Sequence, residues 1–314
     1  MIASQNKLAI ILVNWNTCDY LEKCLVSLYR YYDNPETEIW VIDNASIDGS
    51  VDKVQQKFPQ VQVIGNSENV GFARACNQGI QASSSEYILL LNSDCELVSN
   101  CIDPILAGMG SNAQIGIAGA ILLYPNGKVQ MVGGELLTLK KVFFEQLFLR
   151  SASVFAEKME DVQKRYGSTP FISVDFVSGA CMFIRRTVLN QVGPLREDFF
   201  MYGEDLEFCV RARKNNFAAV VFTHESVIHH KCQSTNKNLE QALRHGLVNN
   251  TLLIAEFGGT GAAILALIFY FIGGLFRLLL SFFRPKVSSR AWFNLLLNYH
   301  RIVFAVVKKL KISL

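Results

Sequence analysis

Acidic side chains stand at the ends of two apolar runs in this sequence, where a sheet would present them to a ligand. Asp43 follows IWVI and begins the run DNASIDGS, and Asp94 closes the run LLNSD. A carboxylate at a strand end can accept the imide N–H of a pyrimidine base, and Mg²⁺ usually takes one or two carboxylates together with substrate phosphates. Taken alone, each acid fits turn or helix-cap chemistry about as well.

A second pair of acids lies late in the chain, in the segment MYGEDLE. Glu204 and Asp205 are expected in a loop, where a carboxylate needs only hydrogen-bond reach to take a proton from a sugar hydroxyl. A salt bridge between Glu207 and an arginine of the helix that follows is the competing, structural interpretation of this segment.

Two basic groups could accompany these acids. His229-His230 follows an apolar strand, and a neutral imidazole is a common metal ligand, although such a pair is also a frequent structural feature. Arg74 and Asn77 are three residues apart on one face of a helix, and the arginine fork suits a phosphate. A surface arginine on a packed helix is the alternative. Glu96 is an alternative to Asp94.

Alternating apolar runs and helix-spaced apolar residues surround these side chains and predict an α/β fold with a mostly parallel sheet. Strands are expected at 8–13, 39–42, 61–64, 87–91, 115–123, 174–185 and 218–222. Helices are expected at 17–32, 51–58 and 72–82 and within 199–215. Ligands of such sheets bind beyond the carboxyl ends of the strands. Polar residues cluster there as Asn14-Trp15-Asn16, Asp43-Asn44 and Asn92-Ser93-Asp94.

Less regular segments complete the body of the chain. Residues 133–167 are expected to form an acceptor-facing loop and helix, and Ser178-Gly179-Ala180 is expected in the middle of the strand at 174–185. The segment 227–234 carries the paired histidines. A domain covering residues 1–250 and a C-terminal helical region covering 251–314 are therefore expected.

Composition excludes several classes of protein. Of 314 residues, 50% are hydrophobic and 18% are charged, which excludes a disordered or collagen-like chain. Residues 257–314 hold eight Lys or Arg and no Asp or Glu, so the rest of the chain carries a net charge of −5 against +3 for the whole. The acidic body argues against nucleic acid as a partner, and the basic tail predicts an anionic membrane surface.

The tail is also apolar. Residues 257–276 contain no charge and are long enough to cross a bilayer, which takes about 20 residues. Trp292, Tyr299 and His300 stand at interface positions of a second amphipathic segment, 292–307. The tail is expected to associate with a membrane, either spanning it or lying in its surface. A pair of helices packed on the body or on a second subunit is the alternative.

The cysteines and the N-terminus bear on the cellular compartment. The eight cysteines form no CxxC pair, and the N-terminal residues show no secretory pattern. We therefore expect reduced thiols and a location at the cytoplasmic face of the cell membrane.

Seven motifs together make the sequence resemble the family 2 glycosyltransferases of the GT-A fold, and most closely their bacterial rhamnosyltransferase-type branch. They occur in family order over residues 7–236. They are VNWN from Val13, DNASIDGS from Asp43, NVGFARACN from Asn69, LLNSD ending at Asp94, VSGACMFIRR from Val177, FFMYGEDLEFCVRA from Phe199 and VIHHKCQST from Val227.

The resemblance implies a role for each candidate residue. Nucleotide-sugar binding would fall to Asn14, Asn16, Asp43, Asn44, Arg74, Asn77, Asn92 and Ser93. Asp94 and His229, or His230 in its place, would hold a divalent metal, Mg²⁺ or Mn²⁺. The metal motif reads Asn-Ser-Asp here, so its first carboxylate is missing. Asp205 would be the general base, with Glu204 as the alternative.

The implied activity is an inverting, metal-dependent transfer of a sugar from a nucleoside diphosphate sugar to a hydroxyl group. dTDP-L-rhamnose is the favoured donor and a UDP-sugar the second, and the acceptor would be lipid-linked or a polysaccharide of the cell envelope. A non-catalytic nucleotide-sugar-binding membrane protein and a nucleotidyltransferase are the alternatives. A nucleotidyltransferase would need a Gly-rich, basic loop after the first strand, where this chain has Asn14-Trp15-Asn16-Thr17. A homo-oligomer remains open.

Overall fold

The computed structural model divides the chain into two compact units. It describes residues 7–131, 133–146, 159–230, 239–281 and 289–310. Unit 1, the sheet unit, comprises Met1–Glu135, Phe155–Phe200 and Glu204–Ser234. Unit 2, the helical unit, comprises Leu136–Val154, Met201–Gly203 and Thr235–Leu314. The boundary expected at residue 250 lies inside a helix of unit 2.

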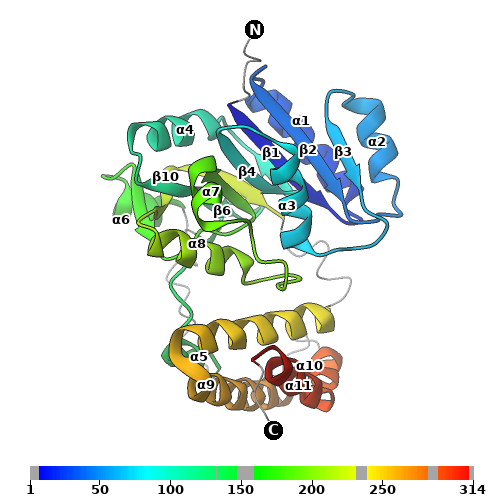
Figure 1. Cartoon of the computed structure of the whole chain (residues 1–314), viewed down its shortest axis with the longest axis vertical. Coiled ribbons are helices and arrows are strands. Elements are labelled where there is room, and N and C mark those ends of the chain that lie inside the picture. The colour runs from blue at the N-terminus through cyan, green and yellow to red at the C-terminus, as the bar shows by residue number, and fades with distance from the viewer. Residues whose placement is uncertain (1–6, 132, 147–158, 231–238, 282–288, 311–314) are drawn as a thin grey trace. The chain divides into compact units, whose positions relative to one another are not determined.

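The first half of the sheet unit has the expected alternation of parallel strands and crossover helices (Figure 1). The strands are β1 (Leu8–Asn14), β2 (Thr37–Asp43), β3 (Gln62–Gly65) and β4 (Tyr87–Asn92). The helices are α1 (Cys18–Tyr31), α2 (Ser50–Lys57) and α3 (Phe72–Ala82). β1 pairs in parallel with both β2 and β4. The chain adds β2 and β3 on one side of β1 and then crosses to the other side to add β4, so the strand order switches at β1. Ligands of open α/β sheets bind at such a point.

The second half of the sheet mixes strand directions. The sheet order is β3-β2-β1-β4-β9-β6-β10-β5, and β7 and β8 pair with β6 and β10 beside this path. The added strands are β5 (Cys95–Leu97), β6 (Ile115–Leu123), β7 (Val129–Met131), β8 (Phe171–Val174), β9 (Cys181–Arg185) and β10 (Ala218–His229). Among the strands of this path, β9 and β5 are antiparallel to the others. The expected mixed, mostly parallel α/β sheet is confirmed.

One expectation about strands was wrong, and another strand is longer than expected. Residues 174–185 do not form one strand, because β8 ends at Val174 and β9 begins at Cys181. Ser178-Gly179-Ala180 lies in the loop between them, where the N–H of Gly179 donates to a side chain and not to a neighbouring strand. The strand expected at 218–222 continues as β10 to His229, with an irregularity between Phe222 and Ser226. The part of the histidine motif from Lys231 to Thr235 lies outside the described residues.

Side chains of the strands alternate between two cores. Leu8, Ile10 and Leu12 pack with apolar residues of α1, α2 and α4 (Ile102–Ser111) on one face. Ile11 and Ile42 pack with α3, α7 (Arg186–Val192) and α8 (Glu204–Lys214) on the other face. Because β1 and β4 are buried on both faces, they read as continuous apolar runs in the sequence. Helix α6 (Met159–Tyr166) adds to the second core.

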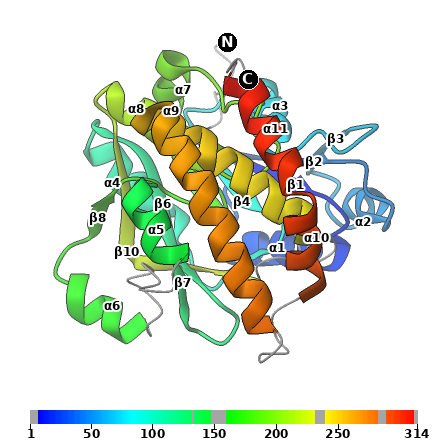
Figure 2. The same ribbon diagram turned by 90° about the horizontal axis from the view of Figure 1, so that it is seen from below.

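The helical unit has a core of its own. It contains α5 (Leu139–Gln146), α9 (Leu239–Ser281), α10 (Ser289–Leu297) and α11 (Tyr299–Leu310). α9 is kinked at Gly259, where φ is 81°, and its two arms form a V beside α10 and α11 (Figure 2). Residues 240–281 are long and apolar enough to cross a membrane. The uncharged run at 257–276 includes the kink, so it does not form one straight helix.

Candidate active site

The carboxyl ends of β1 and β2 bring two predicted binding residues together. Asn14 and Asp43 stand opposite each other in the parallel register. Asn14 Nδ2 donates to Asp43 Oδ1 at 2.7 Å, and the N–H of Ser46 donates to Asp43 Oδ2 at 2.8 Å. These two bonds hold the carboxylate of Asp43 in one orientation at the sheet edge, where the residue is only 3% exposed. Ser46 was not among the predicted site residues.

Hydroxyl groups extend this network toward β4. Thr17 Oγ1 donates to Asn14 Oδ1 at 2.7 Å and lies 2.8 Å from Ser93 Oγ. Asn16 adopts a positive φ of 54°, and its Oδ1 accepts the N–H of Ile47 at 2.9 Å. Two predicted binding residues, Asn14 at the end of β1 and Ser93 after β4, are thus joined through Thr17 into one hydrogen-bonded edge.

Asn44 connects the same edge to the loop before α3. Its Nδ2 donates to the carbonyl of Gly71 at 3.2 Å, and its Oδ1 accepts from Asn66 at 2.9 Å. Gly71 has φ 89°, and a Cβ there would stand 2.7 Å from the carbonyl oxygen of Phe200. The N–H of Phe72 donates to that same oxygen at 2.9 Å. Glycine is therefore required at residue 71, where the two loops cross.

A carboxylate and an imidazole converge beyond the end of β4. Asp94 Oδ1 lies 3.3 Å from His229 Nε2, and the two side chains are 11% and 12% exposed. Asn92 Nδ2 lies 3.3 Å from the same nitrogen. These two side chains offer one oxygen and one nitrogen ligand, a donor set that fits a divalent cation. The geometry therefore accords with the expected metal pair.

Neighbouring groups are less suited to a metal. Cys95 lies within 4.8 Å of both donors, but it is buried and its Sγ donates to the carbonyl of Ala180 at 3.3 Å. Burial raises the pKa of the Cys95 thiol well above its ordinary range. His230, the alternative ligand, instead places its Nε2 3.2 Å from Glu96 Oε2. Of the two histidines, His229 is the one that faces Asp94.

The two late acids lie at the start of α8 in different surroundings. Asp205 is partly exposed, and its carboxylate accepts the N–H groups of Gly179 at 3.1 Å and Leu206 at 2.8 Å. Glu204 is 5% exposed, and its Oε2 has no hydrogen-bond partner among the described residues. The structure therefore orients Asp205 through the backbone and buries Glu204.

Their pKa values follow from these surroundings. Burial, and then the neighbouring Asp205, raises the pKa of Glu204 to about 8. Burial also raises the pKa of Asp205, but the N–H groups of Gly179 and Leu206 oppose that shift because they stabilise the carboxylate. With a pKa of about 8, Glu204 is therefore protonated near neutral pH, whereas the N–H groups that bind Asp205 favour the ionised form of that carboxyl. Two carboxyl groups in unlike environments can thus take unlike roles.

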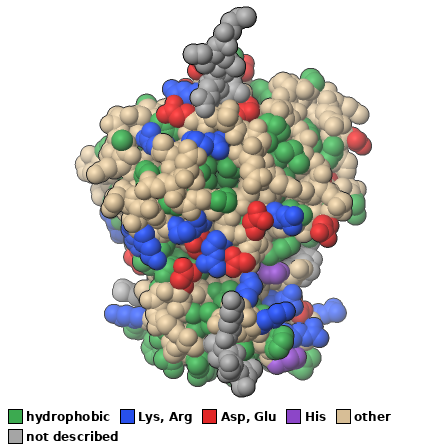
Figure 3. Space-filling model, viewed as in Figure 1, with side chains coloured by type: hydrophobic (Ala, Val, Ile, Leu, Met, Phe, Trp, Pro, Cys, Tyr) green, Lys and Arg blue, Asp and Glu red, His purple; other side chains and the backbone are tan. Residues whose placement is uncertain are grey.

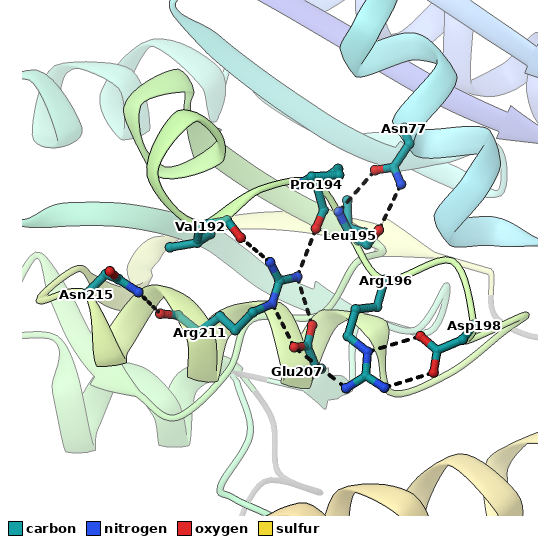
Figure 4. Close-up of polar contacts among 9 residues, drawn as sticks. All are labelled: Asn77, Val192, Pro194, Leu195, Arg196, Asp198, Glu207, Arg211 and Asn215. Carbon is teal, nitrogen blue, oxygen red and sulfur yellow. Dashed lines mark hydrogen bonds and ion pairs between the residues drawn. The ribbon is translucent and has the colours of Figure 1, made fainter. Parts of the chain in front are cut away.

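The two predicted residues of α3 differ in what they contact. Arg74 is exposed, and its Nε lies 3.9 Å from Glu197 Oε2. Asn77 is 1% exposed, donates to the carbonyl of Leu195 at 2.8 Å and accepts its N–H at 3.1 Å. Figure 4 shows this clamp between α3 and the loop before α8. A nucleotide-sugar could reach the side chain of Arg74 directly, whereas the amide of Asn77 holds the loop.

An ion pair within α8 orients an arginine that also binds the segment before the same loop (Figure 4). Glu207 is 2% exposed, and Arg211 binds both of its carboxylate oxygens at 2.7 and 2.8 Å. Arg211 also donates to the carbonyls of Val192 and Pro194. The salt bridge expected for Glu207 is thus present within α8, and Arg211 joins this helix to residues 192–194 through its bonds to their carbonyls.

Four residues that contribute to the site geometry were not predicted. Thr17 and Ser46 bind the Asn14–Asp43 pair, Gly179 binds Asp205, and Gln130 binds His229. Ser46 falls within the DNASIDGS run, so the motif itself was a signal for it. Gly179 falls within VSGACMFIRR, but its assignment to a strand concealed its role. Gln130 lies in no motif.

Comparison with known proteins identifies the family. The model of glycosyl transferase family 2 matches residues 9–193. The chain belongs to this family, and within it the expected rhamnosyltransferase-like branch is confirmed. The chain is 24% identical over 246 residues to the N-acetylglucosaminyl-diphospho-decaprenol L-rhamnosyltransferase of Mycobacterium tuberculosis, covering 74% of this chain and 78% of that protein. It is 29% identical over 213 residues to the low-salt glycan biosynthesis hexosyltransferase Agl10 of Haloferax volcanii, covering 67% and 62%.

Solved structures confirm the α/β GT-A fold. The mannosyltransferase PcManGT of Pyrobaculum calidifontis, in complex with GDP-Man and Mn²⁺, matches with a TM-score of 0.55 at 15% identity, over 98% of this chain and 87% of that one. GalNAc-T7 with UDP, GalNAc and Mn²⁺ matches with a TM-score of 0.56 at 14% identity, over 71% of this chain and 43% of that one. At these identities the likeness concerns the fold. The chain is a glycosyltransferase, and both neighbours hold a divalent metal.

Proposed function

We propose that this protein is an inverting glycosyltransferase that moves a sugar from a nucleoside diphosphate sugar to a hydroxyl of a lipid-linked or polysaccharide acceptor in cell-surface glycan synthesis. The observation that carries the proposal is two polar pairs at strand ends of one sheet: Asn14 with Asp43 at the ends of β1 and β2, and Asp94, after β4, with His229 at the end of β10. dTDP-L-rhamnose is the favoured donor because a rhamnosyltransferase is among the relatives, and a UDP-sugar is the second choice.

The donor would lie along the hydrogen-bonded strand ends. The carboxylate of Asp43 keeps lone pairs beyond the bonds from Asn14 and Ser46, and these can accept the imide N–H of a pyrimidine base. Arg74, which is 58% exposed at the start of α3, can turn its guanidinium toward the diphosphate. Asn16, Asn44, Asn92 and Ser93 would line the path between base and sugar, whereas Asn77 would hold the adjoining loop.

Asp94 and His229 would hold a divalent cation, Mn²⁺ or Mg²⁺. When bound, the cation would neutralise the charge that develops on the leaving diphosphate. The imidazole nitrogen suits a first-row transition ion better than Mg²⁺, whose preferred ligands are oxygens. We therefore expect Mn²⁺ to support transfer at lower concentration than Mg²⁺ does.

Asp205 would act as the general base. Its carboxylate, held by the N–H groups of Gly179 and Leu206, takes the proton of the acceptor hydroxyl as that oxygen attacks the anomeric carbon. The bond from that carbon to the diphosphate oxygen breaks in the same step, so the configuration inverts. The protonated Glu204 cannot accept this proton, which favours Asp205 over its neighbour as the base.

Release of nucleoside diphosphate tests the proposal. The full-length protein in detergent is incubated with dTDP-, UDP- and GDP-sugars, with and without a lipid-linked sugar acceptor, and with Mn²⁺ or a chelator. We expect release from one nucleotide class that depends on acceptor and on metal. Binding without release would indicate a nucleotide-sugar-binding protein, and pyrophosphate release from a nucleoside triphosphate would indicate a nucleotidyltransferase. Either result would contradict the proposal.

The helical unit is proposed to hold the enzyme on the cytoplasmic face of the membrane by lying in the bilayer surface. Residues 260–281 form the second arm of α9. Ala266 and Tyr270 on one face of this arm pack into the core of the unit, and Ala263 is buried. The opposite face exposes large apolar side chains at helical spacing. They are Ile264, Leu265, Ile268, Phe271, Ile272, Leu275, Phe276 and Leu279. An apolar face of this kind is typical of an interfacial helix.

Charge on the same unit supports this placement. Exposed cations of α10 and α11 are Arg290, Arg301, Lys308 and Lys309, and Figure 3 shows Lys and Arg side chains beside hydrophobic ones on these helices. They would attract anionic lipid headgroups. Arg277 is held within the unit by Gln146 and by the ring of Trp292, 5.2 Å away, as in a helix that stays at the surface.

The cytoplasmic side is proposed from the thiols. The seven cysteines within the described residues are free, as is usual in a reducing compartment, while Cys232 lies outside those residues. Arg284, Lys286 and Lys311, which contribute to the basic tail in the sequence, also lie outside them.

Vesicle flotation tests the membrane proposal. Truncation after Glu256 would remove much of the core of the helical unit, so a charge on the exposed face is the sharper variant. We expect the protein to float with vesicles that contain phosphatidylglycerol more than with neutral ones, and Ile268→Glu to lower the bound fraction several-fold. Val26→Glu, on an exposed residue of α1, is the matched control and should change nothing. Equal flotation of Ile268→Glu and the unchanged protein would contradict the proposal.

A further inference from the structure

Gln130 makes two hydrogen bonds to one residue of the candidate metal site. It lies in β7, which pairs with β6, and His229 ends β10, which pairs with the same strand. Gln130 Nε2 donates to the backbone carbonyl of His229 at 3.1 Å, and Gln130 Oε1 lies 2.7 Å from His229 Nδ1. A single amide therefore contacts both the backbone and the ring of this histidine.

The chemistry of these partners fixes where the protons are. A backbone carbonyl only accepts, so the amide group of Gln130 that faces it is the NH₂. The oxygen of Gln130 then faces the ring, and an amide oxygen only accepts, so His229 Nδ1 must carry a hydrogen. In the neutral ring the lone pair is consequently on Nε2. That nitrogen is the one that lies 3.3 Å from Asp94 Oδ1.

The surroundings of Nε2 fit this assignment. Asn92 Nδ2, a donor, lies 3.3 Å from it and can bond to its lone pair. The lone pair of Nε2 and the oxygen of Asp94, 3.3 Å apart, repel each other, and a divalent cation bound by both would offset this repulsion. If the ring were instead doubly protonated, Nε2–H would donate to Asp94 and no lone pair would remain for a metal.

We propose that Gln130 is a positioning residue that holds His229 as the Nδ1–H tautomer, so that the lone pair of Nε2 is directed, with Asp94, at a divalent cation. The inference rests on the metal role in the proposed function, and it adds a residue that lies in no sequence motif. Metal-ligating histidines commonly donate their other ring N–H to such a partner, and loss of the partner lowers metal affinity about 10–100-fold.

Two measurements without any sugar donor test the proposal. The first is long-range ¹H–¹⁵N NMR of protein labelled in histidine, with the His229 signals assigned by their loss in His229→Gln. The second is calorimetric titration with Mn²⁺. We expect a neutral ring protonated on Nδ1 in the unchanged protein. Gln130→Met should give a mixture of tautomers and weaken Mn²⁺ binding about 10-fold or more.

Two variants serve as controls. Gln130→Glu keeps an acceptor for Nδ1–H and should retain more of the Mn²⁺ affinity than Gln130→Met does. Gln62→Met makes the same change on an exposed residue of β3 and should leave binding unaltered. Either of two results would overturn the role of Gln130 but leave the proposed cation site in place: a His229 ring protonated on Nε2, or equal Mn²⁺ affinity of Gln130→Met and the unchanged protein. Absence of Mn²⁺ binding by the unchanged protein would overturn the cation site as well.

Discussion

The sheet unit and the helical unit place polar and apolar side chains in opposite ways. At the strand ends of the sheet unit, Asn14, Asp43 and Ser93 are nearly inaccessible, yet each has a hydrogen-bond partner. On the second arm of α9, Ile268 and Leu279 remain 47% and 60% exposed. A fixed polar edge suits a charged ligand from water, whereas an exposed apolar face suits a lipid surface. In the proposed function, catalysis and membrane contact would therefore fall to separate parts of the chain.

The largest expected effect concerns the catalytic side of this comparison. Asp205→Asn removes the proposed base and should lower kcat by about 10²–10⁴-fold while donor affinity stays nearly unchanged. Steady-state kinetics and donor titration measure the two quantities. Asp103→Asn, on an exposed acid of α4, is the control. Turnover of Asp205→Asn within a few-fold of the unchanged protein would exclude Asp205 as the base.

A second prediction contrasts two arginines of α8. Arg211→Met would leave the buried carboxylate of Glu207 without its main partner and should lower the free energy of unfolding by about 3 kcal/mol. Arg213→Met breaks a more exposed pair with Asp175 and should cost less than about 1 kcal/mol. Urea denaturation compares them, and equal losses would contradict the proposed role of the Glu207–Arg211 pair.

The third prediction tests burial within the helical unit. Ile302 is 1% exposed in the core of the unit, so Ile302→Ala should destabilise α9–α11 by about 2 kcal/mol. Ile264 is 53% exposed, so Ile264→Ala should change stability by less than about 0.5 kcal/mol while it weakens vesicle binding. Hydrogen exchange of peptides from α9 to α11 measures both. A large loss of protection in Ile264→Ala would show that its face is packed.

The last prediction is a pH dependence of stability from Glu204. Its folded-state pKa, raised to about 8 by burial and by Asp205, exceeds the ordinary value of 4.5, so the folded protein binds more protons than the unfolded chain between these pH values. The stability from this group is complete below about pH 4.5 and is lost as pH rises to about 8, by at most about 1.4 kcal/mol per pH unit.

Glu204→Gln should remove that slope. Urea denaturation between pH 5 and 8 should therefore show a flatter stability profile for the variant than for the unchanged protein. Glu68→Gln, on an exposed acid, should keep the original slope. A profile of Glu204→Gln that parallels the unchanged protein would show that Glu204 holds no shared proton.

The sequence predicted the first half of the sheet and the strand-end residues closely. Strands buried on both faces read as uninterrupted apolar runs, and parallel neighbours end at the same sheet edge. Asn14, Asp43 and Asp94 could therefore be placed together before their contacts were known. A helix within 199–215 was also predicted, but Glu204 and Asp205, which were expected in the loop before it, form the first turn of α8.

The remainder depends on contacts between distant segments, which local patterns do not encode. The apolar run around Gly179 is typical of a strand, but its N–H bonds to Asp205, 26 residues away. Gln130 reaches His229 across 99 residues of sequence. The kink at Gly259 divides an uncharged run that composition alone predicts as one continuous span.

The anomeric configuration of the first product tests the central claim most directly. The transfer should be run with whichever nucleotide sugar supports release, and ¹H NMR should follow the new glycosidic bond from the earliest turnovers. A single displacement with Asp205 as base predicts a product whose anomeric configuration is opposite to that of the donor. Retention of the donor configuration would contradict this mechanism, because it would require two displacements and a nucleophile that the account does not assign.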